Sequence, residues 1–240
     1  MPTSAPVSYQ DGNTILKGYC AYPDQTNKKM PAILVCHDWT GRNQFACRKA
    51  DDLTKFGYIG FALDMYGDGK LGNTKEEKSA LIQPFLQNRS KLQNRILAAL
   101  ETLRQLEFVD DTRIGAIGFC FGGLCVLDLA RSGANLVGVV SFHGLLHAPE
   151  ETNAHQIKAK ILALHGYDDP MVTPKQVMAF SDEMTHAKVD WQLHMYGHTM
   201  HAFTNPEAND SGFGTVYDKK ADSRSWRAMQ GFFEEIFSLS

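Results

Sequence analysis

Short apolar runs alternate with longer amphipathic segments along the chain, and this alternation is typical of a parallel sheet covered by helices. Residues 14–22 alternate like a half-exposed antiparallel edge strand. Further strands are expected at 32–36, 58–64, 113–119, 136–142, 160–165 and 191–196. Helices are expected at 45–56, 90–106, 122–131, 174–185 and 223–237. The pattern therefore predicts an α/β fold, with a mostly parallel central sheet and helices on both of its faces.

One segment breaks the alternation. Residues 67–89 carry several glycines, a charge cluster and Pro84. We expect an insertion or a lid above the strand ends, where α/β enzymes keep their variable parts. Because no repeat or interdomain linker interrupts the rest of the sequence, we expect a single domain over residues 1–240.

The composition narrows the choice of partner. The formal net charge is -3 over 240 residues, with both signs dispersed, so the sequence offers no basic stripe for nucleic acid or for an anionic membrane. We find neither a signal-peptide pattern nor an apolar run of the roughly 20 residues that span a bilayer. We expect a cytoplasmic protein with a small-molecule partner, in which most of the five cysteines are free thiols.

The sequence GFCFGG, at 118–123, places a cysteine between glycines where a strand should give way to a helix. A nucleophile on such a turn has strained backbone angles and close neighbours, so its flanking positions need minimal side chains. The turn would hold the sulfur of Cys120 above the sheet. The N–H of Phe121 would lie at the helix start, where it can bond an oxyanion.

An acid and a base follow later in the chain. Asp169 lies just beyond the strand 160–165, and His201 lies in the loop after the strand 191–196. Cys120, Asp169 and His201 thus come in the chain order of the α/β-hydrolase nucleophile, acid and base, each at the carboxyl end of a strand. We therefore predict an α/β-hydrolase fold with a Cys-Asp-His triad.

Neighbouring residues leave alternatives open. Asp168 could replace Asp169 as the acid, but Pro170 fixes the turn after Asp169. His198 could replace His201 as the base, but a small residue and an aromatic follow His201 and can lock its ring. A zinc site built from His194, His198 and His201 lacks cysteine or carboxylate partners at ligand spacing, so we expect no metal.

The sequence resembles the dienelactone hydrolase family over nearly its whole length. The motifs that carry the resemblance are HDWTG (37–41), GYIGFALDMYG (57–67), RIGAIGFCFGG (113–123), HGYDDPMV (165–172) and YGHTMHAF (196–203). The resemblance implies an α/β-hydrolase core with Cys120 as nucleophile, Asp169 as orienting acid and His201 as base. It also implies that the backbone N–H of Trp39 joins that of Phe121 in an oxyanion hole.

Two positions depart from the family pattern. Asp38 stands where relatives usually have a glutamate that helps to control the proton of the nucleophile, and it either keeps that role or caps the following loop. Asn205 stands where relatives that act on dienelactone have an arginine for the substrate carboxylate, so we expect another substrate. The candidates for the substrate pocket are Arg42, Tyr66, Phe85, Arg89, His143 and Asn205, with packing or surface positions as the alternative for each.

The expected reaction is hydrolysis of an ester or lactone through an acyl-thioenzyme, with no metal or organic cofactor. An acyltransferase or a thioesterase with the same triad remains an alternative, as does a binding module that keeps the hydrolase fold without turnover. We expect a monomer or a small homo-oligomer.

Overall fold

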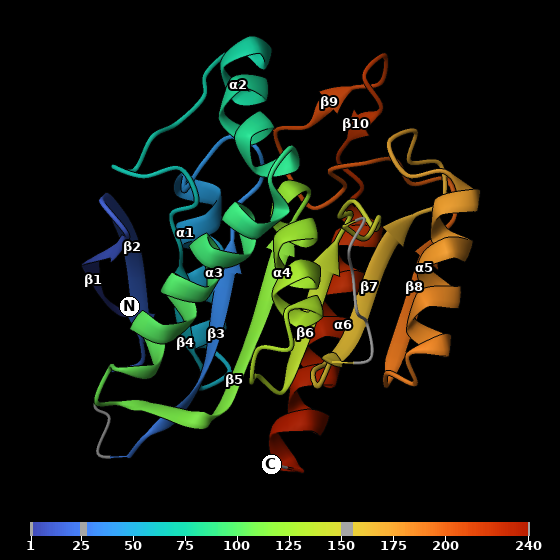
Figure 1. Ribbon diagram of the computed structural model, residues 1–240. Helices are drawn as coiled ribbons and strands as arrows, with labels where there is room; N and C mark the ends of the chain where they lie inside the picture. Colours follow the sequence, from blue (N-terminus) through green and yellow to red (C-terminus); the bar gives the residue numbers. More distant parts are fainter. Residues whose placement is uncertain (1, 25–27, 150–155, 240) are drawn as a thin grey trace. The chain divides into compact units, whose positions relative to one another are not determined.

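The computed structural model describes residues 2–24, 28–149 and 156–239 (Figure 1). The chain forms two compact units that divide after Ile117. Strand β5 crosses this division. The prediction of a single domain stays a prediction.

The first unit contains a sheet in which the order β1-β2-β4-β3 departs from the order along the chain. β2 pairs antiparallel with both β1 and β4, whereas β3 and β4 are parallel. The predicted strand 14–22 is therefore antiparallel as expected, but it is not an edge strand, because β1 covers its outer side. The strands are β1 (Thr3–Asp11), β2 (Thr14–Tyr22), β3 (Met30–Cys36), β4 (Ile59–Ala62) and the first part of β5 (Val109–Phe119).

Helices α1 and α3 lie on opposite faces of this sheet (Figure 1). α1 lies so close to β4 that a Cβ on Gly60 would come within 2.3 Å of the Ala50 carbonyl oxygen. The segment 67–89, predicted to be an insertion or lid, contains α2, which begins with a capping box formed by Thr74 and Glu77. The helices of the unit are α1 (Gln44–Thr54), α2 (Lys75–Leu86) and α3 (Arg89–Arg104).

The second unit contains the parallel strands β6, β7 and β8, which lie in that order. A Cβ on Gly138 would meet Ile236 of α6, whereas the Ser141 side chain lies against Gly123 of α4. Because these positions are three residues apart on β6, α4 and α6 cover opposite faces. The elements are α4 (Phe121–Arg131), β6 (Gly138–Phe142), β7 (Lys160–Gly166), α5 (Pro174–His186), β8 (Trp191–Tyr196), β9 (Asn209–Asp210), β10 (Thr215–Val216) and α6 (Lys219–Ser238).

This arrangement brings the ends of three parallel strands to one edge of the second unit. The loops that follow β6, β7 and β8 carry His143, Asp169 and His201, respectively. The predicted strands and helices are all present, with their ends shifted by at most four residues.

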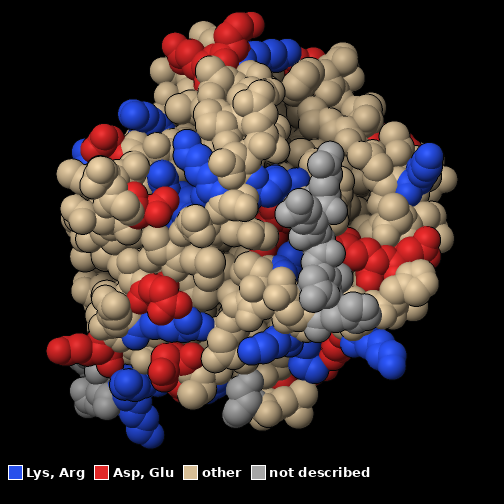
Figure 2. All heavy atoms as spheres, viewed as in Figure 1, with Lys and Arg blue, Asp and Glu red and all other residues tan. Residues whose placement is uncertain are grey.

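Basic and acidic side chains are interspersed on the face drawn in Figure 2, in keeping with the dispersed charge of the sequence. None of the helices in the described ranges has both the length and the apolar character that a bilayer crossing needs.

Candidate active site

Cys120 lies on a strained turn between β5 and α4. Its φ of 55° and ψ of -115° are unusual for a residue with a side chain, and such strain is frequent at functional sites. Gly118 makes the turn possible, because a Cβ there would lie 2.0 Å from the Gly122 carbonyl oxygen. The N–H of Cys120 donates to the Phe142 carbonyl over 3.0 Å, which fixes the turn to the end of β6. The cysteine is partly exposed.

Phe121 is the first residue of α4. The N–H groups of a helix's first turn have no acceptor within the helix, and the helix dipole favours negative charge there. The backbone of Phe121 is thus suitably located, beside Cys120, for its predicted part in an oxyanion hole.

Asp169 and His201 form a buried hydrogen-bonded pair, with 2.7 Å between Oδ2 of Asp169 and Nδ1 of His201. Only 4% of Asp169 and 1% of His201 are exposed. The second carboxylate oxygen, Oδ1, accepts from the Met171 N–H over 2.8 Å. By contrast, Asp168 is 3.9 Å from a fully exposed His198. The structure therefore brings together Asp169 and His201, the two residues favoured from the sequence.

The loop that carries His201 is tied to the segment before α6. The N–H of His201 donates to the Gly214 carbonyl over 3.0 Å, and its carbonyl accepts from Val216 over 3.0 Å. Phe203 is fully buried, as expected for the aromatic that locks this loop. These contacts fix the backbone on both sides of the imidazole.

The pKa of His201 reports its surroundings. Burial alone would lower it, but the electrostatic interaction with Cys120, together with the hydrogen bond to Asp169 and the contact with the Cys120 side chain, raises the pKa to about 10. Nε2 of His201 is buried, and within the described ranges it has no hydrogen-bond partner of ordinary geometry. The contact between Nε2 and the sulfur of Cys120 therefore lies outside the ordinary distance or angle of a hydrogen bond.

In the first unit, the turn after β3 holds Asp38 and Trp39. Oδ1 of Asp38 accepts from the Thr40 N–H over 2.8 Å, which is the contact expected of a loop cap. The Tyr66 hydroxyl donates to the Trp39 carbonyl over 2.8 Å, and the Phe85 ring lies 6.1 Å from that of Tyr66.

Two arginines were candidates for the substrate pocket in this unit. Arg42 donates to the Lys17 carbonyl over 2.5 Å and to the Cys47 sulfur over 3.4 Å, so its guanidinium already has partners. Arg89 is half-buried at the first position of α3.

The two pocket candidates of the second unit differ in burial. His143 is 2% exposed, and its Nε2 lies 2.8 Å from the Thr204 hydroxyl. Asn205 is half-buried, and its side chain accepts from the Glu207 N–H over 3.0 Å.

Two buried histidines were not singled out from the sequence. Nε2 of His37 accepts from the Met65 N–H over 3.2 Å, and its Nδ1 lies 2.6 Å from the Asp38 carbonyl, so the ring supports the turn after β3. Burial lowers the pKa of His165, which lies close to Asp169 and His201. His37 and His165 are the first residues of the motifs HDWTG and HGYDDPMV, which carry the family resemblance. Their places in these motifs were the only signal in the sequence that could have identified them.

The alternative zinc ligand His194 is exposed on β8. Within the described ranges, no three His, Cys, Asp or Glu side chains are grouped as metal ligands would be.

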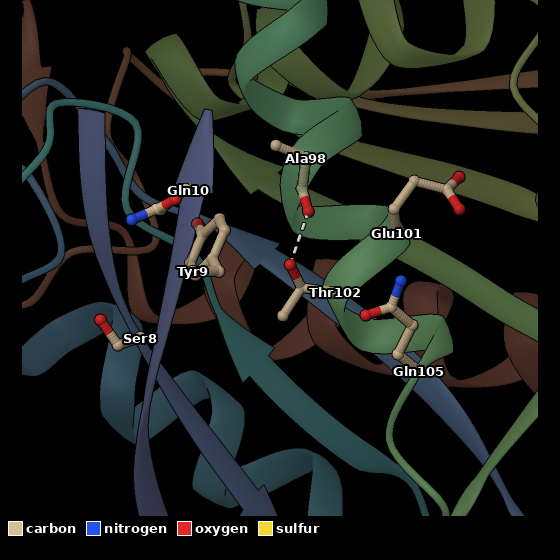
Figure 3. Close-up of a pocket in the computed structure, with 7 residues that line it drawn as sticks. All are labelled: Ser8, Tyr9, Gln10, Ala98, Glu101, Thr102 and Gln105. Carbon is tan, nitrogen blue, oxygen red and sulfur yellow. Dashed lines mark hydrogen bonds between the residues drawn. The ribbon is translucent and has the colours of Figure 1, made fainter. Parts of the chain in front are cut away.

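A groove of about 550 Å³ lies between β1 and α3 in the first unit (Figure 3). None of the predicted site residues lines it. The Thr102 hydroxyl donates to the Ala98 carbonyl over 2.8 Å, and the lining offers no nucleophile paired with a base. The groove therefore lacks the groups that acyl transfer requires. Its lining residues are Ser8, Tyr9, Gln10, Ala98, Glu101, Thr102 and Gln105.

Several known proteins are similar to this chain in fold or in sequence. A crystal structure of a dienelactone hydrolase-like promiscuous phosphotriesterase from metagenomic libraries matches with a TM-score of 0.95 and 36% identity, covering 98% of each chain. A Bradyrhizobium protein named "Probable 2-oxo-3-(5-oxofuran-2-ylidene)propanoate lactonase" is 30% identical over 197 residues, which are 77% of each chain. The carboxymethylenebutenolidase homolog of Xenopus tropicalis is 27% identical over 199 residues, 81% of this chain and 78% of the relative.

These similarities confirm the predicted α/β-hydrolase fold and identify an ester or lactone hydrolase. The model of the dienelactone hydrolase family matches residues 16–237, which is almost the entire sequence. The chain therefore belongs to the dienelactone hydrolase family.

Proposed function

We propose that the enzyme hydrolyses esters or lactones through an acyl-thioenzyme, with Cys120 as nucleophile, His201 as base and Asp169 as orienting acid. The observation that carries the proposal is the buried 2.7 Å pair of Asp169 and His201, whose imidazole interacts with the sulfur of Cys120. A nucleophile next to a base that a third group orients is the general signature of covalent acyl transfer.

In the first half of the reaction, His201 takes the thiol proton and the sulfur attacks the carbonyl carbon. The new C–S bond gives a tetrahedral oxyanion, which the N–H of Phe121 and, as the resemblance implies, that of Trp39 stabilise. When the oxyanion collapses, the C–O bond to the alcohol breaks, and His201 returns its proton to the leaving oxygen. In a lactone that oxygen remains attached to the acyl group.

Water completes the cycle. His201 takes a proton from water as the water attacks the thioester, and collapse of the second oxyanion breaks the C–S bond. The acid leaves, and the proton returns to the sulfur. No step requires a metal or an organic cofactor.

Asp169 acts on the imidazole and not on the substrate. Its bond to Nδ1 keeps the proton on that nitrogen, so that Nε2 faces the reaction as a base. The carboxylate also stabilises the imidazolium that forms when the thiol is deprotonated.

The substrate is proposed to be uncharged near the position of Asn205. An arginine there would contribute about 1.5 to 3 kcal/mol to the binding of a carboxylate, and asparagine lacks that charge. Arg42 is an unsuitable replacement, because its guanidinium is held by Lys17 and Cys47. The bond from Thr40 supports a capping role for Asp38 over control of the thiol proton.

The direct test is hydrolysis of p-nitrophenyl acetate and a neutral lactone by Cys120→Ala. Both activities should disappear while the thermal unfolding midpoint stays close to that of the unaltered enzyme. A variant that retained the full rate would remove the cysteine from the mechanism. If an added alcohol gave ester in place of acid, the enzyme would be a transferase.

A second candidate substrate is a phosphate triester. The support is the 36% identity over 98% of both chains with a promiscuous phosphotriesterase. The sulfur would attack phosphorus, forming an S–P bond as the P–O bond to the leaving alcohol breaks. Water would then attack phosphorus and break the S–P bond, which releases the diester and returns a proton to the sulfur. Hydrolysis of diethyl p-nitrophenyl phosphate should be measurable and should disappear in Cys120→Ala.

A further inference from the structure

Two buried polar side chains of the second unit have no part in the proposed reaction. His143 follows β6 and is 2% exposed, and Thr204 lies three residues after His201 and is 1% exposed. Nε2 of His143 and Oγ1 of Thr204 are 2.8 Å apart, a good hydrogen bond between segments 61 residues apart in the chain. A buried polar pair of this kind fixes the segments that carry it.

One end of the pair is attached to the nucleophile's turn. The Phe142 carbonyl, immediately before His143, accepts the N–H of Cys120 over 3.0 Å. The N–H of His143 itself donates to the Leu164 carbonyl over 2.8 Å. His143 has a φ of 40°, a left-handed conformation that is uncommon for a residue with a side chain. The backbone thus adopts a strained shape that directs this side chain.

The His143 ring also contacts the base, His201. The His143 ring lies edge to face with the His201 ring, with 5.1 Å between centroids and an angle of 66°. It makes a second such contact with Phe203, at 5.0 Å and 79°. The His201 imidazole is therefore held by Asp169 at Nδ1 and by the His143 ring at its side.

We propose that His143 and Thr204 form a positioning pair that holds the His201 imidazole toward Cys120. The proposal rests on the proposed function of that site. It differs from the expectation that His143 lines the substrate pocket, because a positioning residue acts on kcat, whereas a pocket residue acts on KM. A ring free to turn about its bond to Asp169 would spend less time in the orientation that exchanges a proton with sulfur.

The test is Thr204→Val, which removes the hydroxyl with little change in size, in parallel with Thr204→Ser, which keeps it. Thr199→Val is the matched control, since Thr199 is buried in the same loop and its hydroxyl donates to the Gly197 carbonyl over 3.2 Å, a hydrogen bond that involves neither His143 nor His201. Steady-state hydrolysis of p-nitrophenyl acetate separates kcat from KM. The pH dependence of Cys120 alkylation by iodoacetamide, followed by mass spectrometry, reports the thiol and imidazole without a substrate.

Thr204→Val should lower kcat by about tenfold, the effect of one ordinary hydrogen bond, with KM within about twofold. It should also change the pH profile of alkylation, while Thr204→Ser and Thr199→Val stay close to the unaltered enzyme. Thr204→Ala serves as a second variant if valine does not fold, with the same expectation.

An unchanged kcat, or a raised KM at unchanged kcat, would overturn the positioning role. Failure of the proposed function looks different, because Cys120→Ala would then keep its activity whatever Thr204 does.

Discussion

Replacing Asp169 with asparagine tests the orientation of the base most sharply. The substitution keeps the size of the side chain and removes one charge from a pair in which both partners are almost fully buried. A hydrogen bond to a charged group contributes about 1.5 to 3 kcal/mol, which alone corresponds to a loss of roughly 10-fold to 150-fold in kcat/KM. The amide can also donate to Nδ1 of His201, which would leave the proton on Nε2 and remove the base.

The loss of activity caused by the wrong tautomer of His201 adds to the loss caused by removing the carboxylate charge. We therefore expect kcat/KM for p-nitrophenyl acetate to fall by between about 10² and 10⁴. Asp168→Asn is the matched control. That carboxylate is exposed and lies 3.9 Å from an exposed histidine, so its replacement should change kcat/KM by less than about twofold. Thermal unfolding of both variants verifies that they fold. A loss below threefold in Asp169→Asn, or a larger loss in Asp168→Asn, would refute the reasoning.

Three further predictions concern the base His201, the turn at Cys120 and the buried ion pairs of Arg131. In Cys120→Ala, the pKa of His201 should fall from its value of about 10, because the interaction with the sulfur contributes most to raising the pKa and burial, which lowers it, is unchanged. An imidazole titration by NMR that is the same in the variant would contradict this. Gly118→Ala should lower the thermal midpoint and the activity together, since its methyl group would lie 2.0 Å from a backbone oxygen, and a midpoint equal to that of the unaltered enzyme would count against the tight turn. Arg131→Met should reduce the free energy of unfolding by about 3 to 5 kcal/mol in urea titrations, because Arg131 pairs with the fully buried Asp128 carboxylate at 3.3 Å and with the partly exposed Glu183 carboxylate at 2.7 Å. Arg131→Met with Asp128→Leu should recover part of the loss, because it removes the buried charge as well.

The sequence was sufficient to predict the central strands, the main helices and the chain order of the candidate triad. The buried strands are short apolar runs with turn residues at both ends, so hydrophobicity marks them directly. The strained turn at Cys120 could be predicted because only glycine fits the crowded position at Gly118. The Asp169 loop was marked by Pro170.

Other features carried too little local signal. β1 has only Tyr9 buried and contains Pro6, so its pattern suggests a polar terminus until the pairing with β2 is known. The capping box of Thr74 and Glu77 was present in the sequence, but the glycines, the charge cluster and Pro84 led to the expectation of an insertion or lid, in which no helix was assigned. Pro84 lies inside α2 near its C-terminal end, so the helix forms despite the hydrogen bond that proline removes.

The contact between His143 and Thr204 depends on tertiary structure alone. The two residues are 61 positions apart, and neither lies in a pattern that predicts a partner. His143 has a positive φ, and no glycine stands at that position to mark the turn in the sequence. Side-chain contacts of this kind follow from strand register and loop packing, which a single sequence does not specify.

The central claim is that the acyl group passes through the sulfur of Cys120. Rapid mixing of the enzyme with p-nitrophenyl acetate, acid quenching and peptide mass spectrometry test it directly. We predict a burst of p-nitrophenol with an acetyl group on the peptide that contains Cys120, and neither in Cys120→Ala. Steady hydrolysis at the full rate by Cys120→Ala, or acetylation of another residue in the burst, would contradict the account.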